Sequence, residues 1–241
     1  MNRNASYEER RFRVTRIFTV LVSGLVNHLA FSFVAPAFRR RWVREGMDPQ
    51  SEEFRNRWSD FTDRWVFANL VAALVCSVII YLARNATPLS TIIALYGMVR
   101  IVEILAVQLK IVLVDPFDDE GMVRPHYAIT GIQRSIVCLL FNYLEMMLWF
   151  ACLMTFLMGR LGVGADDSYS LIVSANVFGC LTFDSDRVMA LLEVESDWPT
   201  YLALFEAVSG MVMNVVSIGR FVGALPGLQV VSRHGNGPGH K

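Results

Sequence analysis

Residues 135–158 read SIVCLLFNYLEMMLWFACLMTFLM and contain one charged side chain, that of Glu145. A helix needs about 20 apolar residues to cross the roughly 30 Å hydrocarbon core of a bilayer. The stretch therefore predicts a helix that spans a membrane. The composition of the chain agrees, because 54% of its 241 residues are hydrophobic and 18% are charged, whereas soluble domains average about 45–50% and about 25%.

Further apolar stretches lie on both sides of this one. Residues 17–35 and 66–83 contain no charged side chain, and residues 89–114 and 201–225 contain few. Residues 168–183 are also apolar but are too short to span a membrane as a helix. We predict an all-α membrane protein with four to five membrane segments. Both flanks of 17–35 are basic, so the pattern leaves open whether that segment spans or lies at the interface.

The charges between these stretches predict the orientation of the chain. Residues 38–65 contain seven arginines, and the positive-inside rule places such a segment in the cytoplasm. Alternation along the chain then places the acidic segment 159–200 outside and the C-terminal tail in the cytoplasm. The same boundaries divide the chain into a basic N-terminal region (1–65), a transmembrane hairpin with a cytoplasmic loop (66–134), a C-terminal membrane module (135–225) and a tail (226–241).

The C-terminal module is expected to contain an outer helix (135–158), a short helix (168–178) that enters and leaves on one side, a turn that contains Gly179, and an inner helix (201–225). Its outer helix, with LFNYLE at 140–145 and WFA at 149–151, resembles that of two-helix potassium-channel-like proteins of bacteria and archaea. LFEAVSG at 204–210 resembles their inner helix, and DSYS at 167–170 resembles the start of their pore helix. The resemblance implies a pore-loop fold, a homotetramer in a prokaryotic cell membrane, and Glu206 bracing the pore helix.

The expected selectivity filter departs from that family. Potassium filters read Thr-Val-Gly-Tyr-Gly, and their glycines let carbonyl groups face the ion. Here either possible register puts Val177 or Leu181 where a glycine is required. We therefore expect a weakly selective pore lined by side chains, or one blocked by the ring of Phe178. The candidate filter and pore-lining residues are Ser174, Ala175, Asn176, Val177, Phe178, Gly179 and Cys180, with Asp184 and Asp186 in the outer vestibule.

Three charged side chains lie near the middle of predicted helices, where an unpaired charge costs several kcal/mol. We expect Arg100 and Glu103 to form an intramembrane ion pair with Glu145, which lies at a similar depth. A voltage sensor is excluded because it needs several arginines at depth in one helix. In the inner helix, Gly210 is either a gating hinge or a close-packing site, and Asn214 faces either a cavity or a neighbouring helix.

The remaining composition points to no enzyme, cofactor or nucleic-acid partner. The formal net charge is zero, and the four cysteines and four histidines show no metal-binding spacing. The expected partners are further copies of the chain, the lipid bilayer and monovalent cations. The acidic outer segment favours conduction. The altered filter favours the alternative, a non-conducting membrane scaffold or signalling protein that retains the channel fold.

Overall fold

The computed structural model describes residues 17, 20–22, 24, 51–83, 88–113, 132–163, 167–183, 186–190 and 197–224. These residues form α-helices and their connections, with no strand among them. Four helices are long and apolar enough to cross a membrane: α3 (Glu52–Leu82), α4 (Pro88–Leu113), α5 (Ile132–Leu161) and α8 (Asp197–Ala224). The shorter helices are α6 (Tyr169–Thr182) and α7 (Asp186–Ala190).

The all-α class and four of the predicted membrane segments are therefore confirmed, and by length and composition the chain is an integral membrane protein. Most of 17–35 and all of the tail at 226–241 lie outside the described residues. The predicted loop at 38–65 is wrong at its C-terminal end, because α3 begins at Glu52. The hydroxyl of Ser51 caps this start by accepting a hydrogen bond from the backbone N–H of Phe54 at 3.1 Å, as N-cap residues commonly do.

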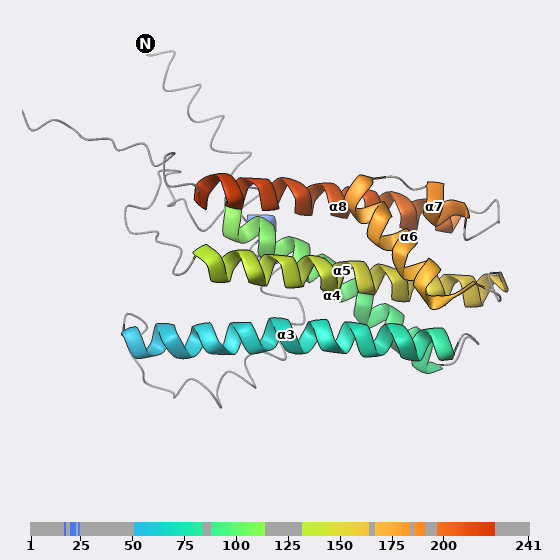
Figure 1. Ribbon diagram of the computed structural model, residues 1–241, viewed down its shortest axis with the longest axis horizontal. Coiled ribbons are helices and arrows are strands. Elements are labelled where there is room, and N and C mark those ends of the chain that lie inside the picture. The colour runs from blue at the N-terminus through green and yellow to red at the C-terminus, as the bar shows by residue number, and fades with distance from the viewer. Residues whose placement is uncertain are drawn as a thin grey trace, which may run out of the picture.

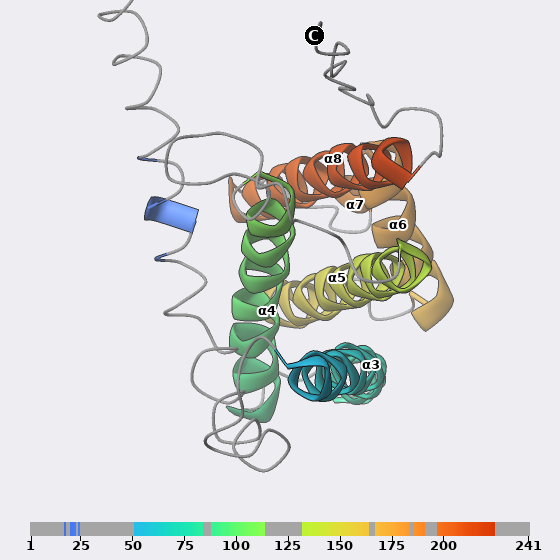
Figure 2. The same cartoon turned by 90° about the vertical axis from the view of Figure 1, so that its left-hand side faces the viewer.

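Helices α3, α5 and α8 lie side by side with similar axis directions, and α5 is in the middle (Figure 1). The chain runs in the same direction along α3 and α5 and in the opposite direction along α8 (Figure 1). Helix α4 crosses the other helices obliquely, from the C-terminal end of α3 to the C-terminal end of α8 (Figures 1 and 2). The short helix α6 crosses from α5 to the middle of α8 (Figure 1).

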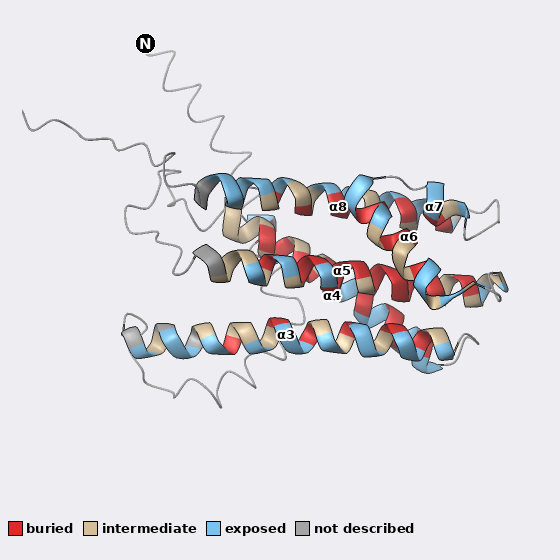
Figure 3. Cartoon of the chain, viewed as in Figure 1, coloured by how far each residue is buried: buried red, intermediate tan, exposed pale blue. Residues whose placement is uncertain are grey.

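The core of the molecule lies around α5. Its side chains Met146, Trp149, Phe150 and Met154 are completely buried, and the red band along α5 in Figure 3 marks this burial. The ring of Phe150 packs edge-on against Phe205 of α8, with centroids 5.5 Å apart. Apolar side chains that stay exposed gather on the outward faces of α3, α4 and α8, where a membrane protein meets lipid or another subunit.

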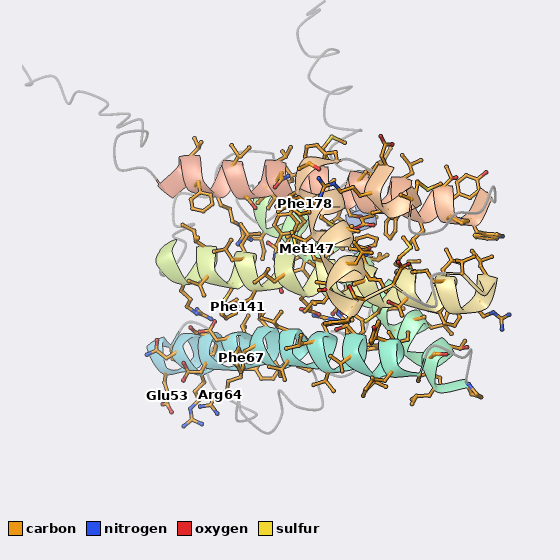
Figure 4. The ribbon with its side chains drawn as sticks, turned by 45° about the vertical axis from the view of Figure 1, so that its right-hand side comes forward. Glu53, Arg64, Phe67, Phe141, Met147 and Phe178 are labelled. Carbon is orange, nitrogen blue, oxygen red and sulfur yellow. The ribbon has the colours of Figure 1, made fainter. Side chains whose placement is uncertain are left out.

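Aromatic side chains also join α5 to the two helices that precede it. Phe67 of α3 and Phe141 of α5 approach each other with ring centroids 6.2 Å apart (Figure 4). On α4, Gly97 leaves room for the ring of Trp149, because a Cβ at this position would lie 2.8 Å from that ring. Helix α5 then ends at Leu161, where Gly162 adopts a φ of 71° that favours glycine. The chain turns there towards α6.

Candidate functional site

The start of α6 is joined to α3 by hydrogen bonds and a ring contact. The hydroxyl groups of Tyr169 and Ser77 are 2.7 Å apart. The hydroxyl of Tyr81 donates to the backbone carbonyl of Asp167 at 3.3 Å, and the rings of Tyr81 and Tyr169 pack edge to face. The side chain of Ser168 caps the helix by accepting from the N–H of Leu171. These contacts fix where the short helix enters the bundle.

The buried face of α6 lies against α5 and α8. Ile172 and Ala175 of α6 belong to one apolar cluster with Met154 of α5 and Ala203 of α8. The helix stops at Thr182, beside Asn214 near the middle of α8. Its C-terminal end therefore lies about half-way along the two long helices that flank it. A helix that ends at this depth places the negative end of its dipole inside the membrane.

Side chains from both flanking helices donate hydrogen bonds to backbone carbonyls at the end of α6. The last four carbonyls of a helix have no partner within the helix. The hydroxyl of Tyr143 on α5 donates to the carbonyl of Cys180 at 2.9 Å, and the amide of Asn214 on α8 donates to that of Leu181 at 3.5 Å. Phe183, which has a φ of 60°, donates its N–H to the carbonyl of Gly179 at 3.0 Å. The tyrosine hydroxyl also lies 3.2 Å from Asn214 Oδ1.

The structure corrects the expected filter. All seven candidates, Ser174, Ala175, Asn176, Val177, Phe178, Gly179 and Cys180, lie within α6. The helix was expected to end at Phe178 and turn at Gly179, but it continues to Thr182. The helix uses the carbonyls of 174–178 in its own hydrogen bonds, so these residues do not form an extended filter. Ala175, Asn176, Gly179 and Cys180 are buried, Ser174 and Val177 are half-buried, and Phe178 is 43% exposed.

Gly179 lies within α6. The absence of a side chain at this position is needed for packing and not for a turn. A Cβ there would lie 3.1 Å from Val188 of α7 and 3.2 Å from the Glu206 carboxyl. Gly210 plays the same part on α8, since a Cβ at Gly210 would overlap the carbonyl oxygen of Cys180 and lie 2.8 Å from its Cα. Of the two interpretations of Gly210, the structure therefore supports close packing. Asn214 contacts the neighbouring helices α5 and α6.

Glu206 lies where the bracing role would place it. Its carboxyl oxygen Oε1 accepts a hydrogen bond from the thiol of Cys180 at 3.6 Å. The residue is 1% exposed. The other carboxyl oxygen, Oε2, has no hydrogen-bond partner. The side chain thus fills the space between α6 and α8 with an incompletely bonded carboxyl group.

The expected ion pair is present between α4 and α5. The guanidinium of Arg100 donates to both carboxylate oxygens of Glu145, at 2.8 to 3.0 Å. Its third nitrogen contacts Glu103 at 2.6 Å, and the indole of Trp149 donates to Glu145 at 3.1 Å. These charges are all buried. Nearby, Tyr96 donates to Asn69 of α3 at 3.1 Å, which extends the polar contacts across three helices.

The two residues expected in an outer vestibule are described in part. Asp184 lies outside the described residues, and Asp186 is exposed on α7. The guanidinium of Arg187, which follows it, lies 4.6 Å from the centre of the Phe178 ring. A positive charge therefore lies next to Asp186, the one expected vestibule residue that the structure describes. No described group of three or more His, Cys, Asp or Glu side chains gathers closely enough to hold a metal ion.

A second polar cluster was not predicted from the sequence. It lies where α5 begins and α8 ends. Arg134 at the start of α5 forms an ion pair with Asp63 of α3, at 2.7 Å. The adjacent residue, Ser135, accepts a hydrogen bond from Arg220 of α8 at 2.9 Å. The first turn of α5 is thereby attached to both neighbours. The sequence does place an arginine and an aspartate at the ends of two predicted membrane-spanning segments. Such charges commonly flank membrane helices, so they do not by themselves indicate an ion pair.

Comparison with protein-family models, curated proteins and solved structures finds no match to this chain. Its function is therefore inferred from its own contacts.

Proposed function

We propose that the chain is a subunit of a homotetrameric, cation-channel-like membrane protein of the pore-loop type, weakly selective among monovalent cations. The main supporting observation is that α6 ends about half-way along α5 and α8, beside Asn214. Short helices that stop within a membrane are tolerated where they are buried in protein or line a water-filled path. The negative end of such a helix attracts cations.

The distribution of basic side chains supports a cytoplasmic C-terminus. Helices α3 and α5 begin, and α4 and α8 end, at the same end of the bundle (Figure 1). Among the residues whose side chains the structure describes, the basic ones at that end are Arg57, Arg64, Lys110, Arg134 and Arg220, and those at the other end are Arg160 and Arg187. The positive-inside rule favours the first end as the cytoplasmic one. In this orientation α6 enters the membrane from outside.

The outward face of α8 is the proposed face towards other copies. Large apolar side chains recur along it at helical spacing and are exposed in the single chain: Leu204, Val208, Met211, Val215 and Ile218. The half-buried polar side chains Asn214 and Ser217 flank this stripe. In the membrane-spanning part of α3, by contrast, the exposed side chains are mainly apolar. Polar groups in a membrane interior favour contact with protein or water over lipid. One chain supplies one copy of α6, so a pore of the pore-loop type requires several copies.

The proposed weak selectivity among cations follows from the helical form of residues 174–180. Because the carbonyls of 174–178 are used within α6, a pathway beside it is lined by side chains. Side-chain pores distinguish potassium from sodium less sharply than a ring of carbonyls does. Phe178 is the exposed ring on this helix, and apolar rings at a constriction gate by excluding water.

Reconstitution tests the proposal directly. The purified chain in liposomes should pass potassium and sodium at similar rates and chloride more slowly, with fluxes measured in parallel. Native mass spectrometry in mild detergent should find the homotetramer. A strong preference for potassium would contradict the side-chain pathway, and a particle that stays monomeric or dimeric would contradict the assembly.

Replacing Phe178 by Ala tests its role as a constriction. We expect Phe178→Ala to increase the cation flux, because the variant removes an exposed ring without touching the buried face of α6. The matched control is Leu171→Ala, since Leu171 is similarly exposed near the start of the same helix. Equal flux in the two variants would remove Phe178 from the pathway.

A non-conducting scaffold is the alternative, and the contacts at the end of α6 favour it. Tyr143 and Asn214 already donate to the terminal carbonyls, and Arg187 places a positive charge beside Phe178. Such a protein would form the homotetramer but pass no ion, with or without Phe178. The two functions are therefore separated by flux and not by assembly.

A further inference from the structure

The carboxyl group of Glu206 lies between α6 and α8, and the proposed pathway makes no use of it. The residue is 1% exposed. One oxygen accepts from the thiol of Cys180 at 3.6 Å, and the other has no hydrogen-bond partner. A thiol is a weak donor. The hydrogen bonding of this group is therefore far from what a carboxylate requires.

No basic side chain among the described residues forms an ion pair with Glu206. Arg220, on the same helix, is 14 residues away in the sequence, which corresponds to about 21 Å along a helix. Arg100 of α4 is held by Glu103 and Glu145. Among the described residues, the helices packed on α6 and α8 carry further titratable or charged side chains, of which Cys180 of α6 forms a hydrogen bond with Glu206. The others include Tyr169 of α6, Tyr143, Glu145, Cys152 and Arg160 of α5, Arg100, Glu103 and Lys110 of α4, and the exposed Asp186 and Arg187 of α7.

An ionised carboxylate in this position is costly. Even after relaxation, burying one unpaired charge in a protein costs several kcal/mol, whereas a neutral polar group costs much less. We propose that Glu206 is a proton-binding site, which holds a proton while α6 is packed on α8 and loosens that packing when the proton is lost. The proposal does not depend on whether the chain conducts.

The close contact around Glu206 explains why its charge would affect the position of α6. Gly210 lies one turn further along α8, and a Cβ there would overlap the backbone of Cys180. Water cannot hydrate a carboxylate at Glu206 unless the two helices move apart. The end of α6 is held there by hydrogen bonds from Tyr143 and Asn214. The packed form is therefore the protonated form, and it is favoured at low pH and lost as the pH rises.

Thermal unfolding of the full chain in mild detergent, from about pH 6 to about pH 9, tests this proposal. The melting temperature of the wild type should fall as the pH rises. Glu206→Gln has the shape of the neutral acid, so its melting temperature should match the wild type at low pH and fall less at high pH. The matched control is Glu145→Gln, an equally buried glutamate. That variant should lower the melting temperature at every pH, because Glu145 binds Arg100.

Alkylation of Cys180 provides a second measurement that reports on the packing itself. Cys76, Cys138 and Cys152 are replaced by Ala, so that a neutral alkylating reagent reports on Cys180 alone. At low pH the thiol should react equally slowly with and without Glu206→Gln. At high pH it should react several-fold faster when Glu206 is present, although a neighbouring negative charge by itself slows thiolate formation.

Two results would overturn the proposal. One is the same dependence on pH, of melting and of alkylation, in the wild type and in Glu206→Gln. The other is a Glu206→Gln variant that is as unstable at low pH as Glu145→Gln, which would mean that Glu206 is charged in the packed form. Neither result depends on ion flux, so failure of this proposal and failure of the proposed channel function are distinguishable.

Discussion

The contact between α4 and α5 and the contact between α6 and α8 each bury a glutamate, but the two carboxyl groups have different hydrogen-bond partners. Glu145, in the first contact, receives hydrogen bonds from Arg100 and from Trp149. Glu206, in the second, receives one bond from a thiol. The first contact depends on complementary charge, and the second depends on close backbone packing around Gly210. Neighbouring helices in one bundle can therefore be joined by different physical means.

The difference predicts different behaviour. A buried ion pair with satisfied partners resists movement, because separating it leaves two charges unpaired. The α4–α5 contact is accordingly expected to act as a rigid brace that positions the outer helix of the module. The α6–α8 contact has few polar links and depends on shape and on the state of one carboxyl group. It is the contact at which we expect movement.

Breaking the ion pair should have the largest effect. Arg100→Gln leaves the buried carboxylates of Glu103 and Glu145 without their cation, so it is expected to lower the free energy of unfolding by about 3–5 kcal/mol. Glu145→Gln should cost less, because Arg100 keeps its ion pair with Glu103. Denaturant titration of the detergent-solubilised chain measures this change. The exchange Arg100→Glu with Glu145→Arg should recover a large part of the loss. A double variant less stable than both single charge reversals would contradict the pairing.

Closing the space at Gly210 should have the next largest effect. A Cβ there overlaps the carbonyl oxygen of Cys180, so Gly210→Ala forces α6 and α8 apart and is expected to cost about 1–3 kcal/mol. Gly219→Ala on the same helix is the control, because no atom lies within 4 Å of its Cβ position. Equal tolerance of alanine at Gly210 and Gly219 would mean that the backbones of α6 and α8 do not approach each other this closely.

The α4–α5 contact could be predicted from the charges in the sequence, whereas the α6–α8 contact was expected only through the family resemblance, which places Glu206 against the short helix. Arg100 and Glu145 lie at similar depths of long apolar stretches, where an unpaired charge is too costly to remain alone. Depth in the membrane and opposite charge together leave few possible partners for Arg100. The four long helices were predictable for the same kind of reason, since their length is set by the thickness of the bilayer.

The end of α6 depends on contacts that no local pattern shows. The sequence predicts a turn at Gly179, but Gly179 lies within α6 and lets Glu206 and Val188 approach the helix. Tyr143 lies within the motif that suggested the outer helix, yet its hydroxyl bonds a carbonyl 37 residues away in the sequence. Such contacts are fixed by how the helices cross.

Removing the polar links at the end of α6 should have a moderate effect. Tyr143→Phe removes the bond to the Cys180 carbonyl and leaves the ring in place, so it is expected to cost about 1 kcal/mol. Asn214→Leu should cost less, because its bond to Leu181 is long at 3.5 Å. Hydrogen exchange of α6 measured by mass spectrometry should rise in Tyr143→Phe. Unchanged exchange would show that backbone packing alone holds the end of α6.

The smallest effect is expected at the outer edge of the α6–α8 contact, where the guanidinium of Arg187 lies 4.6 Å from the centre of the Phe178 ring. Both side chains are exposed, and cation–π contacts at exposed sites contribute about 0.5–1 kcal/mol. Arg187→Gln should therefore lower the free energy of unfolding by no more than that amount. The control is Arg160→Gln, which removes an exposed arginine from the same end of the bundle. A loss as large as that of Gly210→Ala would mean that α7 holds α6 in place through Arg187, and the α6–α8 contact would then depend on charge as the α4–α5 contact does.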